Sequence, residues 1–127
     1  MSIKERLNNI LSKLPEGVTL VAVSKFHPVE RLQEAYEAGQ RVFGESRPQE
    51  MASKYQQLPA DVVWHMIGHL QTNKVKMIAP FVSMISSVDS ERLIEEIEKQ
   101  AAKYNRTIDI LLEVHVAEEE TKSGWNE

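Results

Sequence analysis

Apolar residues recur along this chain in two alternating patterns, one typical of helices and one typical of buried strands. Residues 3–14 carry apolar side chains at spacings of three and four, and Pro15 and Gly17 follow, so this pattern predicts a helix that ends there. The next apolar run, residues 18–23, is short and rich in β-branched residues, which is typical of a strand buried on both faces. The same alternation then repeats along the chain.

Four further strands are predicted, and each pair of neighbouring strands is separated by a helix. The predicted strands are residues 41–44, 62–67, 82–88 and 108–116, and the helices begin near Pro28, Pro48, Thr72 and Asp89 or Ser90. Strict alternation of this kind predicts a parallel sheet with right-handed crossovers, either open and doubly wound or an arc of a (β/α)8 barrel. A barrel usually needs at least ~200 residues, so a barrel built from these 127 residues would be incomplete.

Composition and charge narrow the class of protein. A chain of 127 residues that is 42% hydrophobic and 27% charged is too apolar for a disordered protein, and its length favours one domain over residues 1–127. The net charge is −4 and the basic residues are spread out, which argues against nucleic-acid binding. The absence of cysteine excludes disulfides and thiolate catalysis. With no apolar run near the ~18 residues of a membrane span and no secretory signal, we expect no membrane partner and a cytoplasmic location.

Polar residues follow the predicted strands, at the edge where parallel α/β folds place their functional sites. Lys25 follows a strongly apolar strand, where desolvation would lower the pKa of its ammonium group and leave an amine able to form a Schiff base with an aldehyde or ketone. The alternative is a lysine that reaches out to water at the edge, and the burial argument alone favours that alternative. Lys4, Lys54 and Lys99 are expected on the surface. The residues expected at this edge are Ser24, Lys25, His27, Glu45, Ser46, Arg47, Gly68, His69, Ser86, Ser87, Asp89 and His115, all of them polar except Gly68.

Two other features of the predicted third strand are open to more than one interpretation. His65 and His69 have the spacing of a zinc-binding pair on a helix, but they lie in and after a predicted strand, which favours a core histidine and a loop histidine over a metal site. Residues 68–74 (GHLQTNK) lead into a predicted helix N-terminus that could attract an anion, although a simple loop and cap is favoured. Trp64 is expected in the core.

Five ordered stretches of the sequence carry a family resemblance. They are residues 20–25 (LVAVSK) followed by Pro28, residues 42–46 (VFGES) with residues 49–50 (QE), residues 64–74 (WHMIGHLQTNK), residues 87–90 (SVDS) and residues 119–124 (EETKSG). Together they resemble the pyridoxal phosphate homeostasis protein family, which is related to the N-terminal barrel of alanine racemase. The stretches extend over essentially the whole chain, and residues 64–74 are the most specific of them.

The resemblance implies a fold and a cofactor site. The implied fold is a (β/α)8 TIM-barrel type, pyridoxal phosphate (PLP) fold type III, present here as an incomplete barrel of about five parallel strands with an extra N-terminal helix. The implied domain is a single alanine-racemase-N-terminal-like domain over residues 1–127, truncated before the C-terminal β/α units that carry the main phosphate anchor. Lys25 matches the lysine that holds PLP as a Schiff base. Ser46 stands where the family usually has an asparagine near the cofactor, so that contact is shortened or lost, and His65 lines the same edge by analogy.

The resemblance also implies a function. The family has no well-established enzymatic turnover and is thought to buffer PLP or deliver it to PLP-dependent apoenzymes, so we expect a role in intracellular PLP homeostasis. The first alternative is a PLP-dependent amino-acid racemase. The resemblance implies that such an enzyme takes its second catalytic base from a separate C-terminal domain, which we do not expect in these residues. The second alternative is a metal-dependent hydrolase, which would need more ligands than His65 and His69. Because five strands of an eight-stranded barrel leave two free edges, we also expect self-association.

Overall fold

A single parallel sheet with consecutive strand order organises the chain, whose computed structural model describes residues 2–113. The sheet runs β1-β2-β3-β4-β5, and every neighbouring pair is parallel. The strands are β1 (Ala22–Val23), β2 (Val42–Glu45), β3 (Val63–Met66), β4 (Met84–Val88) and β5 (Asp109–Leu112). The helices are α1 (Ile3–Leu11), α2 (Val29–Glu37), α3 (Pro48–Gln57), the 3-10 turn η1 (Thr72–Lys74), α4 (Val75–Ile78) and α5 (Glu91–Lys103).

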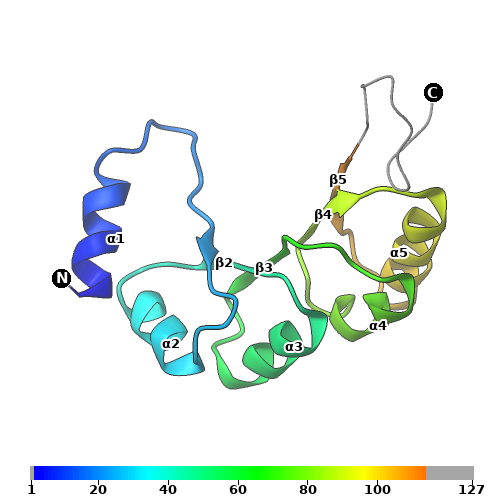
Figure 1. The fold of residues 1–127 in the computed structure, drawn as a ribbon, viewed down its shortest axis with the longest axis horizontal. Helices are drawn as coiled ribbons and strands as arrows, with labels where there is room; N and C mark the ends of the chain where they lie inside the picture. Colours follow the sequence, from blue (N-terminus) through cyan, green and yellow to red (C-terminus); the bar gives the residue numbers. More distant parts are fainter. Residues whose placement is uncertain (1, 114–127) are drawn as a thin grey trace.

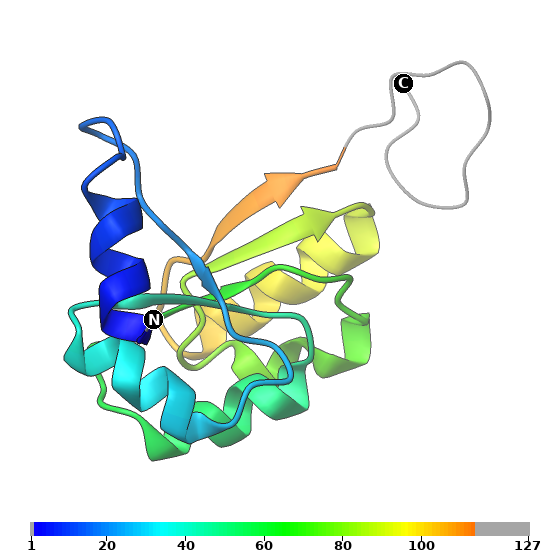
Figure 2. The same cartoon turned by 60° about the vertical axis from the view of Figure 1, so that its left-hand side comes forward.

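The helices that connect the strands all lie on one side of the sheet. In Figures 1 and 2, α2, α3, α4 and α5 follow one another along the outer face of a curved sheet, while the opposite face carries no helix. A doubly wound sheet would reverse its strand order and place helices on both faces. Consecutive order with helices on one face is the arrangement of a (β/α)8 barrel, so the prediction of an incomplete barrel is confirmed and the doubly wound alternative is wrong.

The strand register assigns side chains to the two faces of the sheet, because aligned residues of parallel strands point to the same side. Phe43 aligns with Trp64, and both are 1% exposed beneath the helices. Gly44 aligns with His65, His65 with Met84, and Met84 with Asp109, so these residues lie on the open face. The core therefore fills the space between sheet and helices, where Trp64 is a core residue as predicted. The largest fully buried side chains there also include Met51, Met66, Leu70, Ile78 and Ile85.

The helix boundaries follow local signals in the sequence. Ser2 and Glu5 form a reciprocal capping box at the start of α1, and Ser90 accepts a hydrogen bond from the Leu93 N–H at the start of α5. Pro48 occupies the first turn of α3, as predicted. Gly39, which follows α2, has a φ of 110°, a conformation that favours glycine after a helix.

Several boundaries differ from the predictions, including the starts of β2 to β5, which lie one or two residues later than predicted. Pro28 precedes α2 as its N-cap, so the helix begins one residue later than predicted. Thr72 caps nothing and instead begins the 3-10 turn before α4. The first strand was predicted over residues 18–23 with both faces buried, but only Ala22–Val23 pairs with β2, and Val23 is 55% exposed because no element covers the open face there. The predicted fifth strand includes residues 114–116, which lie outside the described residues.

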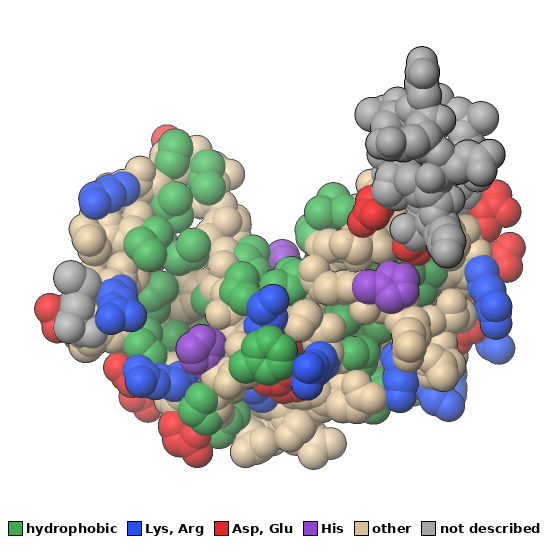
Figure 3. All heavy atoms as spheres, in the orientation of Figure 1, with side chains coloured by type: hydrophobic (Ala, Val, Ile, Leu, Met, Phe, Trp, Pro, Cys, Tyr) green, Lys and Arg blue, Asp and Glu red, His purple; other side chains and the backbone are tan. Residues whose placement is uncertain are grey.

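The open face and the sheet edge expose apolar side chains. Val23 of β1 is 55% exposed, and Leu111 and Leu112 of β5 are each 53% exposed. Val21 and Val63 are half-buried. Figure 3 shows a hollow between α1 and the ends of β4 and β5, with hydrophobic side chains gathered along its α1 side and its floor.

Candidate functional site

Lys25 lies in a tight turn at the carboxyl end of β1, which we call the Lys25 turn and define as residues 24–27. The His27 N–H donates to the Ser24 carbonyl at 3.1 Å and closes the turn, and the Ser24 N–H donates to the Gly44 carbonyl of β2 at 2.9 Å. The Lys25 side chain is exposed and makes no hydrogen bond or ion pair within the described residues. The expectation that burial of Lys25 would desolvate its amine is therefore wrong in this structure, while its predicted place at the strand end is confirmed.

The third residue of the Lys25 turn has an uncommon backbone conformation. Phe26 has a φ of 67°, in the left-handed region that type II turns normally fill with glycine. Phe26 is 65% exposed, and the Arg47 guanidinium lies 4.7 Å from the centroid of its ring. Its N–H donates to Glu50 Oε2 at 2.8 Å. A carboxylate on α3 therefore holds a strained residue next to Lys25.

A buried group of charges lies directly behind the Lys25 turn, and we call Glu45, Glu50 and Lys54 the ion network. Lys54 Nζ lies 2.8 Å from Glu45 Oε2 and 2.8 Å from Glu50 Oε2. The same amine donates to the Ser24 carbonyl at 2.8 Å, and the Ser24 hydroxyl donates to Glu45 Oε2. The side chain of Glu45 is 0% exposed and that of Lys54 is 6% exposed. The ion network thus joins β2 and α3 to the backbone on both sides of Lys25.

The prediction that Lys54 lies on the surface is wrong. Met51 of α3 and Leu58, which caps the C-terminus of α3, face the core, and helical spacing would place Tyr55 on the same face. Tyr55 is instead 38% exposed and stacks on Phe81 with ring centroids 4.0 Å apart. Lys54 takes the inward position because two carboxylates and a backbone carbonyl satisfy its ammonium group there. Glu50 and Lys54 are four residues apart on a helix, a spacing that could have predicted their ion pair from the sequence.

Glu50 is ionised in this setting. Its partial burial raises the pKa, but hydrogen bonds from Lys54 and from the Phe26 N–H and the positive charges of Lys54 and Arg47 outweigh that effect. The pKa of Glu50 therefore lies below its ordinary value. The carboxylate remains available as an acceptor for the Lys25 turn throughout the neutral pH range.

Ser46 and Gly68 bring the ends of β2 and β3 close together. A Cβ atom on Gly68 would lie 2.9 Å from Ser46 Cβ and 3.1 Å from the Ser46 carbonyl oxygen. Only glycine therefore allows the chain leaving β3 to pass this close to Ser46. Ser46 is half-buried at the same edge as Lys25, one strand away.

His65 lies on the open face of the sheet, half-buried in the middle strand. Burial lowers the pKa of His65, and the carboxylate of Asp109 on the same face opposes this only in part. Its imidazole is therefore neutral at pH 7. Lys25, Ser46 and His65 belong to three neighbouring strand units, but no hydrogen bond or ion pair connects them within the described residues.

The lowered pKa of His65 predicts a pH dependence of stability. Below about pH 6.5 the unfolded chain binds the proton more readily than the folded chain, so the free energy of unfolding should fall as the pH decreases toward the folded pKa. The contribution of this one group has a maximal slope of ~1.4 kcal/mol per pH unit. Urea unfolding between pH 7 and pH 5 should show a weaker pH dependence for His65→Gln than for the unchanged chain. An identical slope in both proteins would contradict the assignment.

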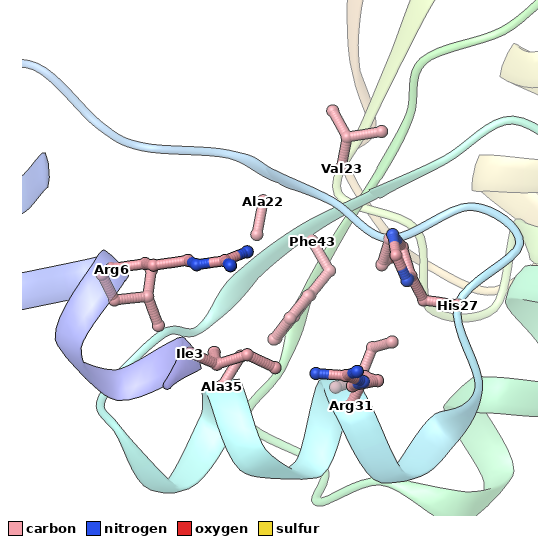
Figure 4. A pocket seen from close by; sticks show the side chains of 11 residues that line it. Ile3, Arg6, Ala22, Val23, His27, Arg31, Ala35 and Phe43 are labelled. Carbon is pink, nitrogen blue, oxygen red and sulfur yellow. The ribbon is translucent and has the colours of Figure 1, made fainter. Parts of the chain in front are cut away.

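A separate cavity of about 310 Å³ lies between α1, β1 and α2. Figure 4 shows Phe43 at its centre, with Arg6 reaching in from α1 and Arg31 from α2. Its wall includes Ser24 and His27, but not Lys25, Ser46 or His65. The cavity is therefore adjacent to the Lys25 turn without containing the predicted cofactor-binding residues.

The remaining predicted polar positions are dispersed. His69 is exposed, and its Nδ1 lies 3.8 Å from Asp89 Oδ2. Among residues 2–113, no group of three or more His, Asp or Glu side chains is placed to hold a metal ion. The helices of residues 2–113 lack the combination of length and hydrophobicity that a membrane-spanning helix requires. His115 and the stretch 119–124 lie outside the described residues.

Comparison with known proteins assigns the family. The family model described as alanine racemase, N-terminal domain matches residues 1–125. The chain belongs to this family. Among curated members, the pyridoxal phosphate homeostasis protein of Aquifex aeolicus is 41% identical, over 98% of this chain and 59% of its own length. The chain thus spans about 59% of the length of that relative.

Solved structures of family members have the same fold. PipY of Synechococcus elongatus with PLP bound is 41% identical, has a TM-score of 0.86, and matches 98% of this chain and 58% of its own. Alanine racemase of E. faecalis shares the fold, with a TM-score of 0.73 at 18% identity. This match covers 97% of this chain and 34% of the racemase chain. The resemblance and the barrel type inferred from the sequence are therefore confirmed, and PLP is a ligand of a close relative.

Proposed function

We propose that this chain binds PLP through a Schiff base on Lys25 and, as part of a longer barrel, serves PLP homeostasis in the cytoplasm. The observation that carries the proposal is the free amine of Lys25, exposed at the carboxyl end of β1 in a chain related to the PLP-binding PipY. PLP supplies an aldehyde, and condensation with a neutral lysine amine forms the C=N bond and releases water. Delivery to PLP-dependent apoenzymes is part of the same proposal.

The described residues fit the aldehyde end of this cofactor. Lys25 has no competing partner, and the turn that carries it is hydrogen-bonded to β2 and α3. A neutral His65 on the open face can accept or donate one hydrogen bond without adding charge. The Ser46 hydroxyl can do the same at the neighbouring strand end, with a shorter reach than an asparagine amide. Ser46 and His65 are therefore proposed cofactor contacts beside Lys25.

The racemase alternative has weaker support. The likeness to alanine racemase is at 18% identity and concerns the fold. Racemisation needs acid and base groups on both faces of the substrate carbon. Among the described residues, Lys25 supplies an unpaired amine, His65 lies within β3, and the imidazoles of His27 and His69 are exposed after β1 and β3; none of the three histidines is hydrogen-bonded to Lys25. The observations favour cofactor binding over turnover.

A titration with PLP tests the proposal. The unchanged chain and Lys99→Ala, a control at an exposed lysine of α5, should develop the same saturable visible absorption band. Lys25→Ala should lose the band because no amine stands at that position to form the C=N bond. The proposal fails if Lys25→Ala and the unchanged chain give the same saturable band.

A further inference from the structure

We infer that Glu50 is a positioning residue for Lys25, acting with Lys54 and Glu45 to fix the turn from which the Lys25 amine projects. This inference rests on the proposed role of Lys25 and extends it to residues that do not touch the cofactor. The ion network binds two backbone groups of the Lys25 turn, the Ser24 carbonyl and the Phe26 N–H. The turn's other backbone hydrogen bonds are made by the Ser24 N–H to β2 and by the His27 N–H within the turn. The ion network therefore acts on Lys25 through the backbone of the turn.

The contacts place one anchor on each side of Lys25. On the preceding side, the Ser24 carbonyl accepts from Lys54 Nζ at 2.8 Å, and the Ser24 hydroxyl donates to Glu45. On the following side, the Phe26 N–H donates to Glu50 Oε2 at 2.8 Å. Because Lys54 also binds Glu50 at 2.8 Å, the two anchors share one cation. Lys25 is the residue between them, and its own side chain takes no part in the network.

The backbone of Phe26 explains why anchoring is needed. A phenylalanine at a φ of 67° occupies a region that residues with a Cβ atom rarely adopt, so the turn would relax if nothing held it. Glu50 is the acceptor that holds it, and the Arg47 guanidinium against the Phe26 ring adds a second contact from the same α3 end. Strained residues that persist beside a reactive group commonly preorganise that group.

The charge arrangement favours a positioning role over simple packing. Glu45 and Lys54 alone would form a buried pair, yet Lys54 also binds the Ser24 carbonyl and a second carboxylate. Glu50 is the more exposed of the two carboxylates, with 22% of its side chain exposed, and Lys54 keeps Glu45 and the Ser24 carbonyl as partners when Glu50 is replaced. Substitution of Glu50 therefore separates the position of the Lys25 turn from the folding of the domain.

The test uses three α3 variants of the whole chain. Glu50→Ala removes the acceptor of the Phe26 N–H, Glu50→Gln keeps an oxygen acceptor without the charge, and Gln49→Ala is an exposed neighbour as the control. Two quantities are measured: hydrogen exchange of the Phe26 amide by NMR, and the ratio of pyridoxyl label on Lys25 to that on Lys99 after PLP and borohydride. Glu50→Ala should speed Phe26 exchange about tenfold or more, the factor expected for a lost hydrogen bond to a charged group. It should also lower the labelling ratio, with Glu50→Gln intermediate and Gln49→Ala unchanged.

Two results would overturn the inference. One is an unchanged Phe26 exchange rate in Glu50→Ala, which would show that the carboxylate does not hold the turn. The other is accelerated exchange with an unchanged labelling ratio, which would show that the position of the turn does not matter to Lys25. If the unchanged chain itself shows no preference for Lys25, the proposed function fails, and Phe26 exchange alone then decides whether Glu50 anchors the turn.

Discussion

Lys54→Met should destabilise the folded chain by about 3–5 kcal/mol, the cost of removing one partner from a buried ion pair. The substitution leaves the fully buried carboxylate of Glu45 without its cation and removes a donor to the Ser24 carbonyl. Because small proteins are stable by only about 5–15 kcal/mol, this is a large part of the total. Urea unfolding followed by circular dichroism at low protein concentration measures the difference.

Two companion variants show whether the loss comes from the buried charge. Lys99→Met removes an exposed lysine from α5 and should change the free energy of unfolding by less than about 0.5 kcal/mol. The double variant Glu45→Gln/Lys54→Met should be more stable than Lys54→Met alone, because it no longer buries an unpaired charge. A loss below about 1 kcal/mol for Lys54→Met would contradict the buried ion network.

The chain should self-associate through its open face and sheet edge as its concentration rises. Val23, Leu111 and Leu112 are each more than half exposed, and the helices cover only the other face of the sheet. At ~25 cal/mol per Å² of apolar surface, covering a few hundred Å² would contribute several kcal/mol. A second copy of the open sheet offers that cover. Sedimentation velocity across a concentration series should show a weight-average mass that rises above 14.5 kDa.

Charged substitutions identify the surface responsible. Val23→Lys and Leu111→Lys should each shift association to higher concentration, because they place an ammonium group on the proposed contact. Ile10→Lys, at a residue of α1 that is 46% exposed, should leave association unchanged. A chain that stays monomeric at every concentration, or that responds equally to all three substitutions, would contradict this account.

The periodicity of apolar residues was enough to predict the order of elements and the parallel sheet. Gly39 and Pro48 act through local backbone preferences, so the C-terminal end of α2 and the start of α3 follow from the sequence. The length of β1 did not follow, because strand pairing depends on a neighbour that the local sequence does not specify. Periodicity alone left the choice between a doubly wound sheet and a barrel open, and the position of the helices on one face decides it.

The sequence predicted the position of Lys25 at a strand end, but it did not predict the buried contacts behind that position. Lys25 was found because it ends an apolar strand, and its place there holds. The role of Lys54 was missed because a lysine on a helix is usually exposed, and its burial depends on Glu45, which lies on another element. The left-handed Phe26 had no sequence signal at all, since phenylalanine has no preference for that conformation.

Reductive trapping of PLP on the unchanged chain shows directly whether Lys25 forms the Schiff base. Borohydride converts the Schiff base to a stable secondary amine, and peptide mapping then locates the pyridoxyl group. We predict one dominant labelled peptide that contains Lys25, with little label on the exposed Lys4 and Lys99. Label spread evenly over Lys4, Lys25 and Lys99 would contradict the account, because Lys25 would then react as an ordinary surface amine.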